Sequence, residues 1–437
     1  MQYRPRVIDD RVDAVLADMA SVVIQGPRGC GKTTTGLHHA QSSIHLDNPG
    51  QIATLADQDR ATLLAGDTPR LIDEWQLAPQ LADSIRREID DRQAKGQFIL
   101  THSVYPPDGQ LPNLWGRASG LTMKTMTLSE SGHSTNAVSL EDLRQTNTVT
   151  PARTDIGYPD LAVEAVRGGW PALLEADIES AMEYNNAYLD KLCSSDIVTD
   201  TGVIHNPVGL RAVLSSLARN TAQESNFRTI CDDVAAAGLA MNPIAVGYCL
   251  IALRKAFALE ELPSWPKAAS RKIALGDKTH LADPGLACAA LCLSPQMLAQ
   301  DPEFSEQVFK AMAIRDLSVY AGNHGGALYH HQETTGLKVD AIIEYAWSWA
   351  AIQITLGESM IARAEQDLIQ LRDEQSRLIP SPYIPTHAEQ SPARLRDERE
   401  DTFDIGAPAF MAIVTGTEYA YTLPSGVHII PLATMCP

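Results

Sequence analysis

The chain has 437 residues, which is too long for one ordinary hydrophobic core and suggests roughly two to four domains. Hydrophobic residues make up 44% and charged residues 20%, as is typical of a soluble globular protein. The net charge of −19 argues against a general nucleic-acid coat protein, which needs positive charge to neutralise phosphates. No apolar run is long enough to span a bilayer and the N-terminus lacks an apolar signal core, so we expect no membrane association and a cytoplasmic location.

The first element with a chemical signature runs from Ser21 to Thr35. It consists of a short apolar strand, a glycine-containing loop and the first turn of a helix, and its loop matches the P-loop pattern G-x-x-x-x-G-K-[ST]. Glycines allow consecutive backbone N–H groups to face phosphate oxygens, and the following helix adds the positive end of its dipole. The pattern predicts an ATP site with Mg²⁺, in which Lys32 reaches the phosphates and Thr33 ligates the metal. The predicted nucleotide-binding residues are Gly26, Pro27, Arg28, Gly29, Cys30, Gly31, Lys32, Thr33 and Thr34.

The next strand, within residues 69–76, ends in the acidic pair Asp73 and Glu74. An aspartate at a strand end can hold the Mg²⁺ shell, and the adjacent glutamate can orient and deprotonate the attacking water. The spacing of roughly forty residues from the P-loop is typical of an ATPase site. We therefore predict Asp73 as a metal ligand and Glu74 as a catalytic residue.

A third strand, residues 98–103, ends in Thr101, His102 and Ser103. Ligands of open parallel sheets lie at the carboxyl ends of strands, so Thr101 or Ser103 is placed to sense the γ-phosphate or its water. The alternative is an ordinary polar strand end. Arg117 follows, either as a solvated surface residue or as an arginine finger. The finger could also be supplied to a neighbouring subunit, in which case the chain would form a homo-oligomer. Near the N-terminus, three side chains could flank the nucleotide base, although a simple surface role is favoured: Tyr3, Arg4 and Arg6.

These segments resemble a widespread bacterial and archaeal family of uncharacterised AAA-type ATPases. The resemblance lies in GPRGCGKTTT, LIDEWQ, FILTHS and GRASGLTMKTMTLSESG, and it continues through Gly168-Gly169-Trp170-Pro171 towards the C-terminus. Members of the family pair this ATPase domain with a C-terminal domain of unknown function. The resemblance implies the same roles for Lys32, Thr33, Asp73 and Glu74, and makes Arg117 a plausible finger. His102 departs from the family, which usually carries glycine there.

The middle of the chain, from Ile178 to about Leu298, is rich in helix-forming residues. Residues 225–253 are predicted to form two helices joined by a turn at Gly238, and a strand near Ala256–Leu259 would complete a winged helix. Such a unit either reads DNA or packs against protein. The second helix has basic residues only at its end, which favours protein. The best basic patch is Lys267, Arg271, Lys272, Lys278 and His280.

The last part is predicted to have the order α-β-β-β-α-β, which resembles the restriction-endonuclease-like fold. Nucleases of that fold need an acid on the first helix, an aspartate on the second strand and Glu-x-Lys on the third. Asp340 is present, but Lys310 replaces the first acid, and Gln353 and Thr355 replace Glu-x-Lys. Since these side chains are poor ligands for a divalent cation, we expect no DNA cleavage. The polar insert at residues 380–403 is predicted to be a mobile loop.

The seven cysteines are scattered, and Cys288 and Cys292 lie four apart on an apolar helix. Buried free thiols are a better interpretation than zinc ligands, because no other cysteine is near in sequence. A set of this kind suits a reducing compartment.

Together these patterns predict an α/β fold in four parts: an AAA-type P-loop ATPase domain at 1–135, a linker at 136–180, a helical winged-helix-like domain at 181–300, and an inactive restriction-endonuclease-like domain at 301–437. The predicted catalytic residues are Glu74, Lys32, Arg117 and Thr101; the metal ligands are Thr33 and Asp73. The predicted function is Mg²⁺-dependent ATP hydrolysis that drives a switch on a protein or DNA partner. The alternatives are an ATP-binding module with negligible turnover and an ATP-regulated DNA nuclease.

Overall fold

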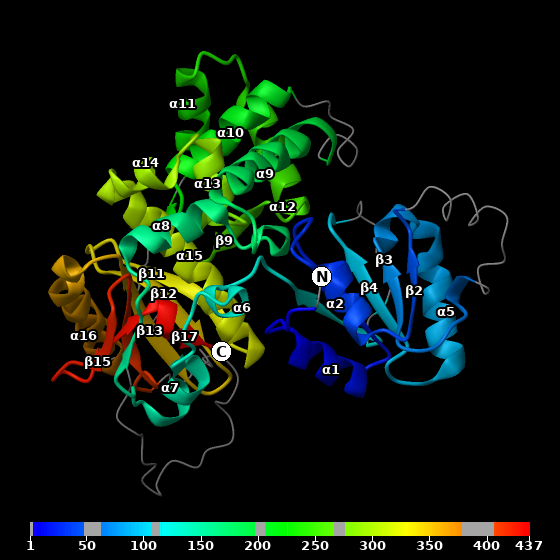
Figure 1. Ribbon diagram of the computed structural model, residues 1–437, viewed down its shortest axis with the longest axis horizontal. Coiled ribbons are helices and arrows are strands. Elements are labelled where there is room, and N and C mark those ends of the chain that lie inside the picture. The colour runs from blue at the N-terminus through cyan, green and yellow to red at the C-terminus, as the bar shows by residue number, and fades with distance from the viewer. Residues whose placement is uncertain are drawn as a thin grey trace, which may run out of the picture.

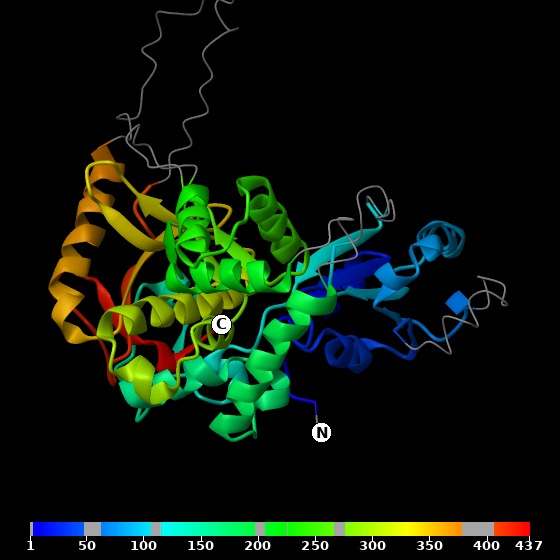
Figure 2. The same ribbon diagram turned by 90° about the horizontal axis from the view of Figure 1, so that it is seen from above.

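The computed structural model describes residues 3–47, 63–105, 114, 116–196, 206–224, 226–265, 276–377 and 406–437. The N-terminal α/β unit and the C-terminal sheet lie at opposite ends of the molecule, with middle helices between them (Figures 1 and 2). The basic residues Lys267, Arg271 and Lys272 and the insert at 380–403 lie outside the described residues.

The N-terminal unit is a five-stranded parallel sheet with strand order β2-β3-β4-β1-β5. The strands are β1 (Ser21–Gln25), β2 (Ser42–His45), β3 (Arg70–Asp73), β4 (Phe98–His102) and β5 (Ala118–Thr122). The accompanying helices are α1 (Asp9–Asp18), α2 (Lys32–His39), η1 (Trp75–Leu77), η2 (Pro79–Leu81) and α5 (Ala82–Arg92). All five residues of β4 are buried, as expected for a parallel strand covered on both faces. Because the strands are parallel, the P-loop and the ends of β3 and β4 meet at one edge.

Residues 136–180, which we predicted to be a linker, contain several helices and two short strands among the described residues. The elements from 128 to 173 are α6 (Leu128–Ser131), β6 (Val138–Ser139), α7 (Leu140–Thr146), β7 (Ala152–Arg153), α8 (Tyr158–Arg167) and η3 (Pro171–Leu173). β6 pairs with β17 (Met435–Cys436), and β7 pairs with β15 (Tyr419–Thr422). The two-residue strands β6 and β7 depend on partners about 270 to 300 residues away, which no local pattern reveals.

The middle region contains the predicted helix-turn-helix, formed by α11 (Phe227–Ala236) and α12 (Pro243–Lys255). Asn226 and Asn242 cap these helices, each accepting a hydrogen bond from a backbone N–H three residues on. The neighbouring helices are α9 (Ile178–Lys191), η4 (Leu192–Asp196), α10 (Pro207–Arg219), α13 (Pro284–Ala290) and α14 (Pro295–Ala299). An antiparallel sheet with the order β8-β10-β9 accompanies them, made of β8 (Gln223–Glu224), β9 (Leu259–Leu262) and β10 (Lys278–Leu281). The strand after α12 thus starts three residues later than predicted.

The C-terminal part is built on a seven-stranded sheet with the order β11-β12-β13-β14-β16-β15-β7. Its elements are α15 (Pro302–Asn323), β11 (Ala327–Gln332), β12 (Lys338–Glu344), β13 (Trp349–Thr355), η5 (Glu358–Met360), α16 (Ile361–Arg377), β14 (Met411–Thr415), β15, β16 (His428–Pro431), η6 (Leu432–Thr434) and β17. The predicted α-β-β-β-α-β order is observed. β15 was not predicted, since only Ala420 of its four residues is buried.

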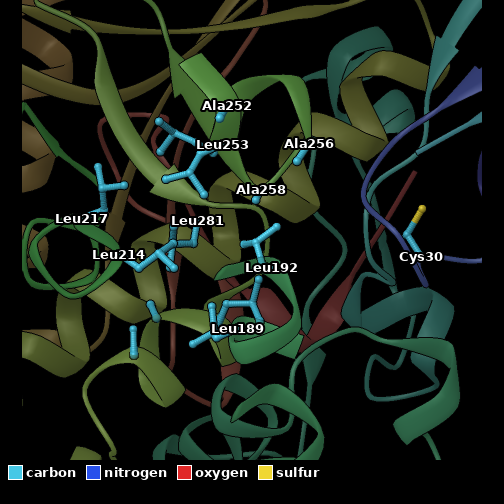
Figure 3. Close-up of a cluster of buried hydrophobic side chains, with 14 of the residues drawn as sticks. Cys30, Leu189, Leu192, Leu214, Leu217, Ala252, Leu253, Ala256, Ala258 and Leu281 are labelled. Atoms are coloured by element: carbon cyan, nitrogen blue, oxygen red, sulfur yellow. The ribbon is translucent and has the colours of Figure 1, made fainter. Parts of the chain in front are cut away.

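The N-terminal sheet and the middle helices share one hydrophobic cluster. It contains Val22, Cys30 and Leu121 from the first unit and a group of helix and strand residues from the middle region, among them Leu189, Leu217, Leu253 and Leu281. Figure 3 shows the middle-region side chains crowded together, with Cys30 of the P-loop to one side of them. The loop that carries the nucleotide-binding motif is therefore packed against the middle region.

Candidate functional site

The predicted P-loop lies between β1 and α2, and its geometry depends on glycine at two positions. A Cβ at Gly26 would lie 2.1 Å from the carbonyl oxygen of Met123, which leaves no room for a side chain. Gly31 precedes α2 with a φ of 110°, in the left-handed region. A tight loop of this kind at a helix N-terminus is suited to binding phosphate through backbone N–H groups.

Lys32 is almost fully buried and its ammonium group points into the loop. Its Nζ donates hydrogen bonds to the carbonyl oxygens of Gly26, at 3.0 Å, and Pro27, at 2.9 Å. In this position the carbonyl oxygens of the loop accept the hydrogen bonds of the Lys32 ammonium group. Phosphate oxygens can replace them as acceptors, because a lysine ammonium is a compact charge on a flexible stem.

Around the loop, Pro27 and Cys30 are buried, Arg28 is half-buried, and Gly29 and Thr34 are exposed. The Cys30 thiol donates to the carbonyl oxygen of Met123 at 3.5 Å, so its side chain anchors the loop.

Two hydroxyl groups and an imidazole contact the Asp73 carboxylate near the ends of neighbouring strands. Thr33 Oγ1 donates to Asp73 Oδ1 at 2.9 Å, and Thr101 Oγ1 donates to the same oxygen at 2.5 Å. His45, the last residue of β2, places Nδ1 3.2 Å from Asp73 Oδ2. The predicted metal ligands Thr33 and Asp73 and the predicted catalytic residue Thr101 therefore meet in one cluster. Hydroxyl and carboxylate oxygens are the ligands that Mg²⁺ prefers, so this donor set fits the ion.

Glu74 follows Asp73 with a φ of 53°, in the left-handed region that a glutamate rarely adopts. Its backbone N–H donates to Thr101 Oγ1 at 3.0 Å. Its side chain accepts hydrogen bonds from Ser103 Oγ and from Gln76 Nε2, the latter at 2.5 Å. The carboxylate is thus held beside Asp73 by the end of β4 and by its own turn.

Two residues of this cluster were missed by the sequence analysis. His45 ends a strand next to β3, and the rule that ligands lie at strand ends would have identified it. Gln76 is two residues after Glu74, and only the positive φ of Glu74 turns the two side chains together. No local pattern indicates that turn.

Comparison with protein-family models identifies the region that carries this site. A model described as an AAA domain matches residues 19–131. Residues 19–131 are an AAA ATPase domain. A second model, described as a domain of unknown function (DUF8612), matches residues 159–297. The expected pairing of an AAA-type ATPase domain with a separate domain of unknown function is confirmed. The comparison with curated proteins gives no match.

Among solved structures, the Walker-type ATPase PABY2304 of Pyrococcus abyssi is similar at 15% identity with a TM-score of 0.40, covering 66% of this chain and 96% of that one. AMPPCP-bound DnaA from Aquifex aeolicus has 12% identity, a TM-score of 0.28, and coverage of 57% and 86%. The Aeropyrum pernix Orc1 protein in complex with DNA has 12% identity, a TM-score of 0.26, and coverage of 64% and 90%.

A cavity of roughly 680 Å³ opens beside the P-loop of the AAA domain. It is lined by residues of the N-terminal segment, of α2 and of the turn before α9, including Tyr3, Arg6, Thr34, Thr35 and Pro171. The segment Gly168-Gly169-Trp170-Pro171, predicted to pack the ATPase domain against the middle region, does lie against the loop: a Cβ at Gly31 would be 3.5 Å from Pro171. This cavity has the size of a small-ligand pocket and adjoins the helix N-terminus.

Arg6 lines this cavity and does not lie on the surface. It is 7% exposed, donates to the carbonyl oxygen of Cys30 at 2.8 Å, and forms an ion pair with Glu130. The same Glu130 closes a capping box with Thr127 at the start of α6. These contacts of Arg6 therefore hold the P-loop in position.

Arg117 is not brought to the site within one chain. It precedes β5 at the amino end of the sheet, where its backbone carbonyl accepts from the N–H of Ser21, the first residue of β1. The P-loop follows the other end of β1. The Arg117 guanidinium makes two hydrogen bonds to Asp90, at 2.6 and 3.0 Å. A role as arginine finger is therefore restricted to the site of a neighbouring subunit.

Three of the four positions considered for nuclease chemistry, Lys310, Asp340 and Gln353, come together in the C-terminal part, but without the ligands of a metal. Asp340 on β12 receives hydrogen bonds from Lys310 Nζ at 2.9 Å and from Lys278 Nζ at 3.2 Å, and Gln353 Oε1 accepts from the Asp340 N–H. Burial alone would raise the pKa of Asp340, but the two ammonium groups outweigh it and hold the pKa at about 2. Thr355 instead donates to the carbonyl oxygen of Gly357. Lys278 was expected only as part of a basic patch.

Within the described ranges, no cluster of three or more His, Cys, Asp or Glu side chains is placed to hold a metal ion. Cys288 is buried as predicted, but Cys292 is exposed, because it follows the end of α13 in a left-handed turn. No helix among the described residues has the length and apolar character needed to cross a membrane.

Proposed function

We propose that this protein binds ATP with Mg²⁺ at the P-loop and hydrolyses it, and that the resulting cycle switches its interaction with a protein or DNA partner. The observation that carries the proposal is the meeting of Thr33, Thr101 and Glu74 around Asp73, beside a buried Lys32. These residues come from three separate segments, and an ordinary structural turn does not require their convergence.

Each residue has a role that follows from its chemistry. Lys32 binds the phosphate chain once its ammonium leaves the loop carbonyls, and backbone N–H groups of residues 26–34 contribute further donors. Thr33 and Asp73 would hold Mg²⁺, which neutralises charge on the phosphates when bound. Glu74 orients the attacking water and accepts its proton. The Thr101 hydroxyl holds Asp73 and Glu74 in position, because it donates to the Asp73 carboxylate and accepts from the Glu74 N–H. The 680 Å³ cavity is the proposed site for the base and ribose.

The same proposal assigns folds to the other two parts. A winged-helix arrangement of the middle region is supported by its element order, α10, β8, α11, α12, β9 and β10. A restriction-endonuclease-like fold of the C-terminal part, without nuclease activity, is supported by the order of elements from α15 to β14. On α12 the exposed side chains include Ile244, Tyr248 and Ile251, and its basic residues Arg254 and Lys255 lie at the C-terminal end. An apolar helix face of this kind favours a protein partner over DNA, which requires many cationic contacts.

Phosphate release from ATP tests the proposal, measured with and without Mg²⁺ and with and without duplex DNA. We expect turnover that requires Mg²⁺, and the Lys32→Ala variant should bind ATP about 10- to 100-fold more weakly, because charge-assisted hydrogen bonds are lost. Lys95→Ala is the matched control, since Lys95 is an exposed lysine of the same domain. Equal ATP binding by wild type and Lys32→Ala would contradict the proposal, and stimulation by DNA would assign the partner to nucleic acid.

A further inference from the structure

The end of β4 in the AAA domain contacts the middle region directly. The backbone N–H of Tyr105 donates to the carbonyl oxygen of Lys255, the last residue of α12, at 2.8 Å. The Tyr105 ring packs against the ring of Phe257 with centroids 4.5 Å apart and an angle of 30° between the planes. Both contacts join residues about 150 positions apart in sequence.

His102, at the end of β4, also packs against Tyr105 and Phe257. Its ring is 1% exposed and lies 5.7 Å from the Phe257 ring, 5.5 Å from Tyr105 and 6.1 Å from Trp75, measured between centroids. Burial, together with the nearby Lys32 ammonium, lowers the pKa of His102 to about 4, so the imidazole is neutral at physiological pH. A neutral ring suits an aromatic cluster.

The residues on either side of His102 are the ones that hold the acidic pair. Thr101 donates to Asp73, and Ser103 donates to Glu74. Because these three residues are consecutive, packing that fixes the position of His102 also restrains the backbone that carries Thr101 and Ser103. The ring of Phe257, which lies outside the AAA domain, thus contacts the residue between the two hydroxyl donors.

Phe257 keeps an unfavourable backbone conformation at this contact. Its φ is 53°, in the left-handed region, which is unfavourable for a bulky residue. Glycine would adopt this conformation without strain. At this strained position the phenylalanine ring makes contacts with His102 and Tyr105 that glycine could not make.

We propose that Phe257 is a positioning residue for the ATP site, which holds His102 and Tyr105 so that Thr101 and Ser103 present their hydroxyl groups to Asp73 and Glu74. This inference rests on the proposed ATPase function. It makes residues 255–257, at the end of α12, part of the machinery that sets the turnover rate. A partner that displaces α12 would change turnover without touching ATP.

The test compares ATP binding and steady-state phosphate release in Phe257→Ala, Phe257→Leu and Phe257→Tyr. We expect Phe257→Ala to lower kcat about tenfold while the Kd for ATP with Mg²⁺ stays within about twofold, since misplacement of catalytic groups slows chemistry more than binding. Phe257→Leu keeps apolar volume and should show a smaller loss, and Phe257→Tyr, which retains the ring, should keep most of the activity. Phe227→Ala is the matched control, because Phe227 is a half-exposed phenylalanine on α11. Unchanged kcat in Phe257→Ala, or a parallel loss of ATP binding, would overturn the inference.

Hydrogen exchange separates this inference from the ATPase proposal. Adding ATP and Mg²⁺ should alter exchange at the P-loop, at the Tyr105 amide and at residues 255–258 in wild type, whereas in Phe257→Ala only the P-loop should respond. Absence of phosphate release from wild type would contradict the proposed hydrolysis, yet the exchange experiment would still test the contact. A P-loop response in wild type with no response at Tyr105 and 255–258 would overturn the role of Phe257.

Discussion

Arg6 and Glu130 form a buried ion pair, with Arg6 Nε 3.0 Å from Glu130 Oε1, that connects the segment before the first helix to the segment after the first sheet. Arg6 also donates to the carbonyl oxygens of Cys30 and Lys124. Glu130 also accepts from the N–H groups of Val7 and Thr127. The two side chains thus hold the P-loop against the start of α6.

Arg6→Met should destabilise the protein by about 3–5 kcal/mol, because it leaves the Glu130 carboxylate buried without its counter-ion. Urea unfolding measures the loss. Lys95→Met is the control, since Lys95 and Asp18 form an exposed pair and its removal should cost less than about 1 kcal/mol. A loss for Arg6→Met no greater than that of the control would contradict a bracing role.

Asp340→Asn should also destabilise the protein, by about 3–5 kcal/mol, because Lys278 and Lys310 then lose their shared carboxylate. The folded pKa of about 2 is below the usual value of 3.8. The stabilisation by Asp340 is therefore complete above pH 3.8 and lost as the pH falls towards 2. Asp155→Asn, which alters an exposed carboxylate, is the control for the unfolding measurement.

The same cluster predicts that the protein does not cleave DNA. Two ammonium groups occupy the space around Asp340 in which a nuclease would bind a cation, and an amide replaces the second carboxylate. Incubation with supercoiled plasmid and Mg²⁺ or Mn²⁺ should give no nicked or linear product. Cleavage that disappears in Asp340→Ala would show that the site is an active nuclease.

The stability of the protein should fall as the pH is lowered from 6.5 towards 4, because His330 is buried as a neutral imidazole. Burial and the neighbouring Lys278 lower the pKa of His330 to about 4, and one ring nitrogen lies 2.7 Å from the carbonyl oxygen of Gly276. Since the unfolded chain binds the proton at higher pH, His330 contributes a loss on the order of 3 kcal/mol by pH 4.

His330→Gln removes this titration and keeps a donor for Gly276, so its free energy of unfolding should change less between about pH 7 and pH 4.5 than that of wild type. His38→Gln, at an exposed histidine of α2, should follow the wild-type slope. Equal slopes for wild type and His330→Gln would contradict the assignment.

If Arg117 acts as a finger, it acts between subunits, since it lies at the far end of the sheet from its own P-loop. Activity per molecule should then rise with protein concentration, and Arg117→Ala should abolish that rise while leaving ATP binding unchanged. A flat dependence on concentration in a strictly monomeric sample would exclude the role.

The strand-end residues of the AAA domain could be predicted from sequence because their signals are local. The P-loop pattern predicts β1 and α2. Because the sheet is parallel, the ends of β3 and β4 lie at the same edge as the P-loop, which brings Asp73, Glu74 and Thr101 close to it. The helix-turn-helix was predictable for the same reason: Asn226 and Asn242 precede apolar helical patterns.

The remaining features depend on contacts between distant segments. Nothing near Lys278 in sequence indicates that it reaches Asp340, 62 positions away, and nothing near Phe257 indicates the ring of His102. β6 and β7 are only two residues long and exist through their pairing with the C-terminal strands. Such contacts become visible only once the domains are packed together.

A single-turnover reaction with radiolabelled ATP, Mg²⁺ and an excess of protein tests the central claim most directly, by comparing wild type with Glu74→Gln. Our account predicts that both proteins bind ATP, that wild type converts it to ADP and phosphate, and that Glu74→Gln does so about 10²- to 10⁴-fold more slowly. If wild type binds ATP but forms no ADP, or if Glu74→Gln reacts as fast as wild type, the assignment of a Glu74-dependent ATPase is contradicted.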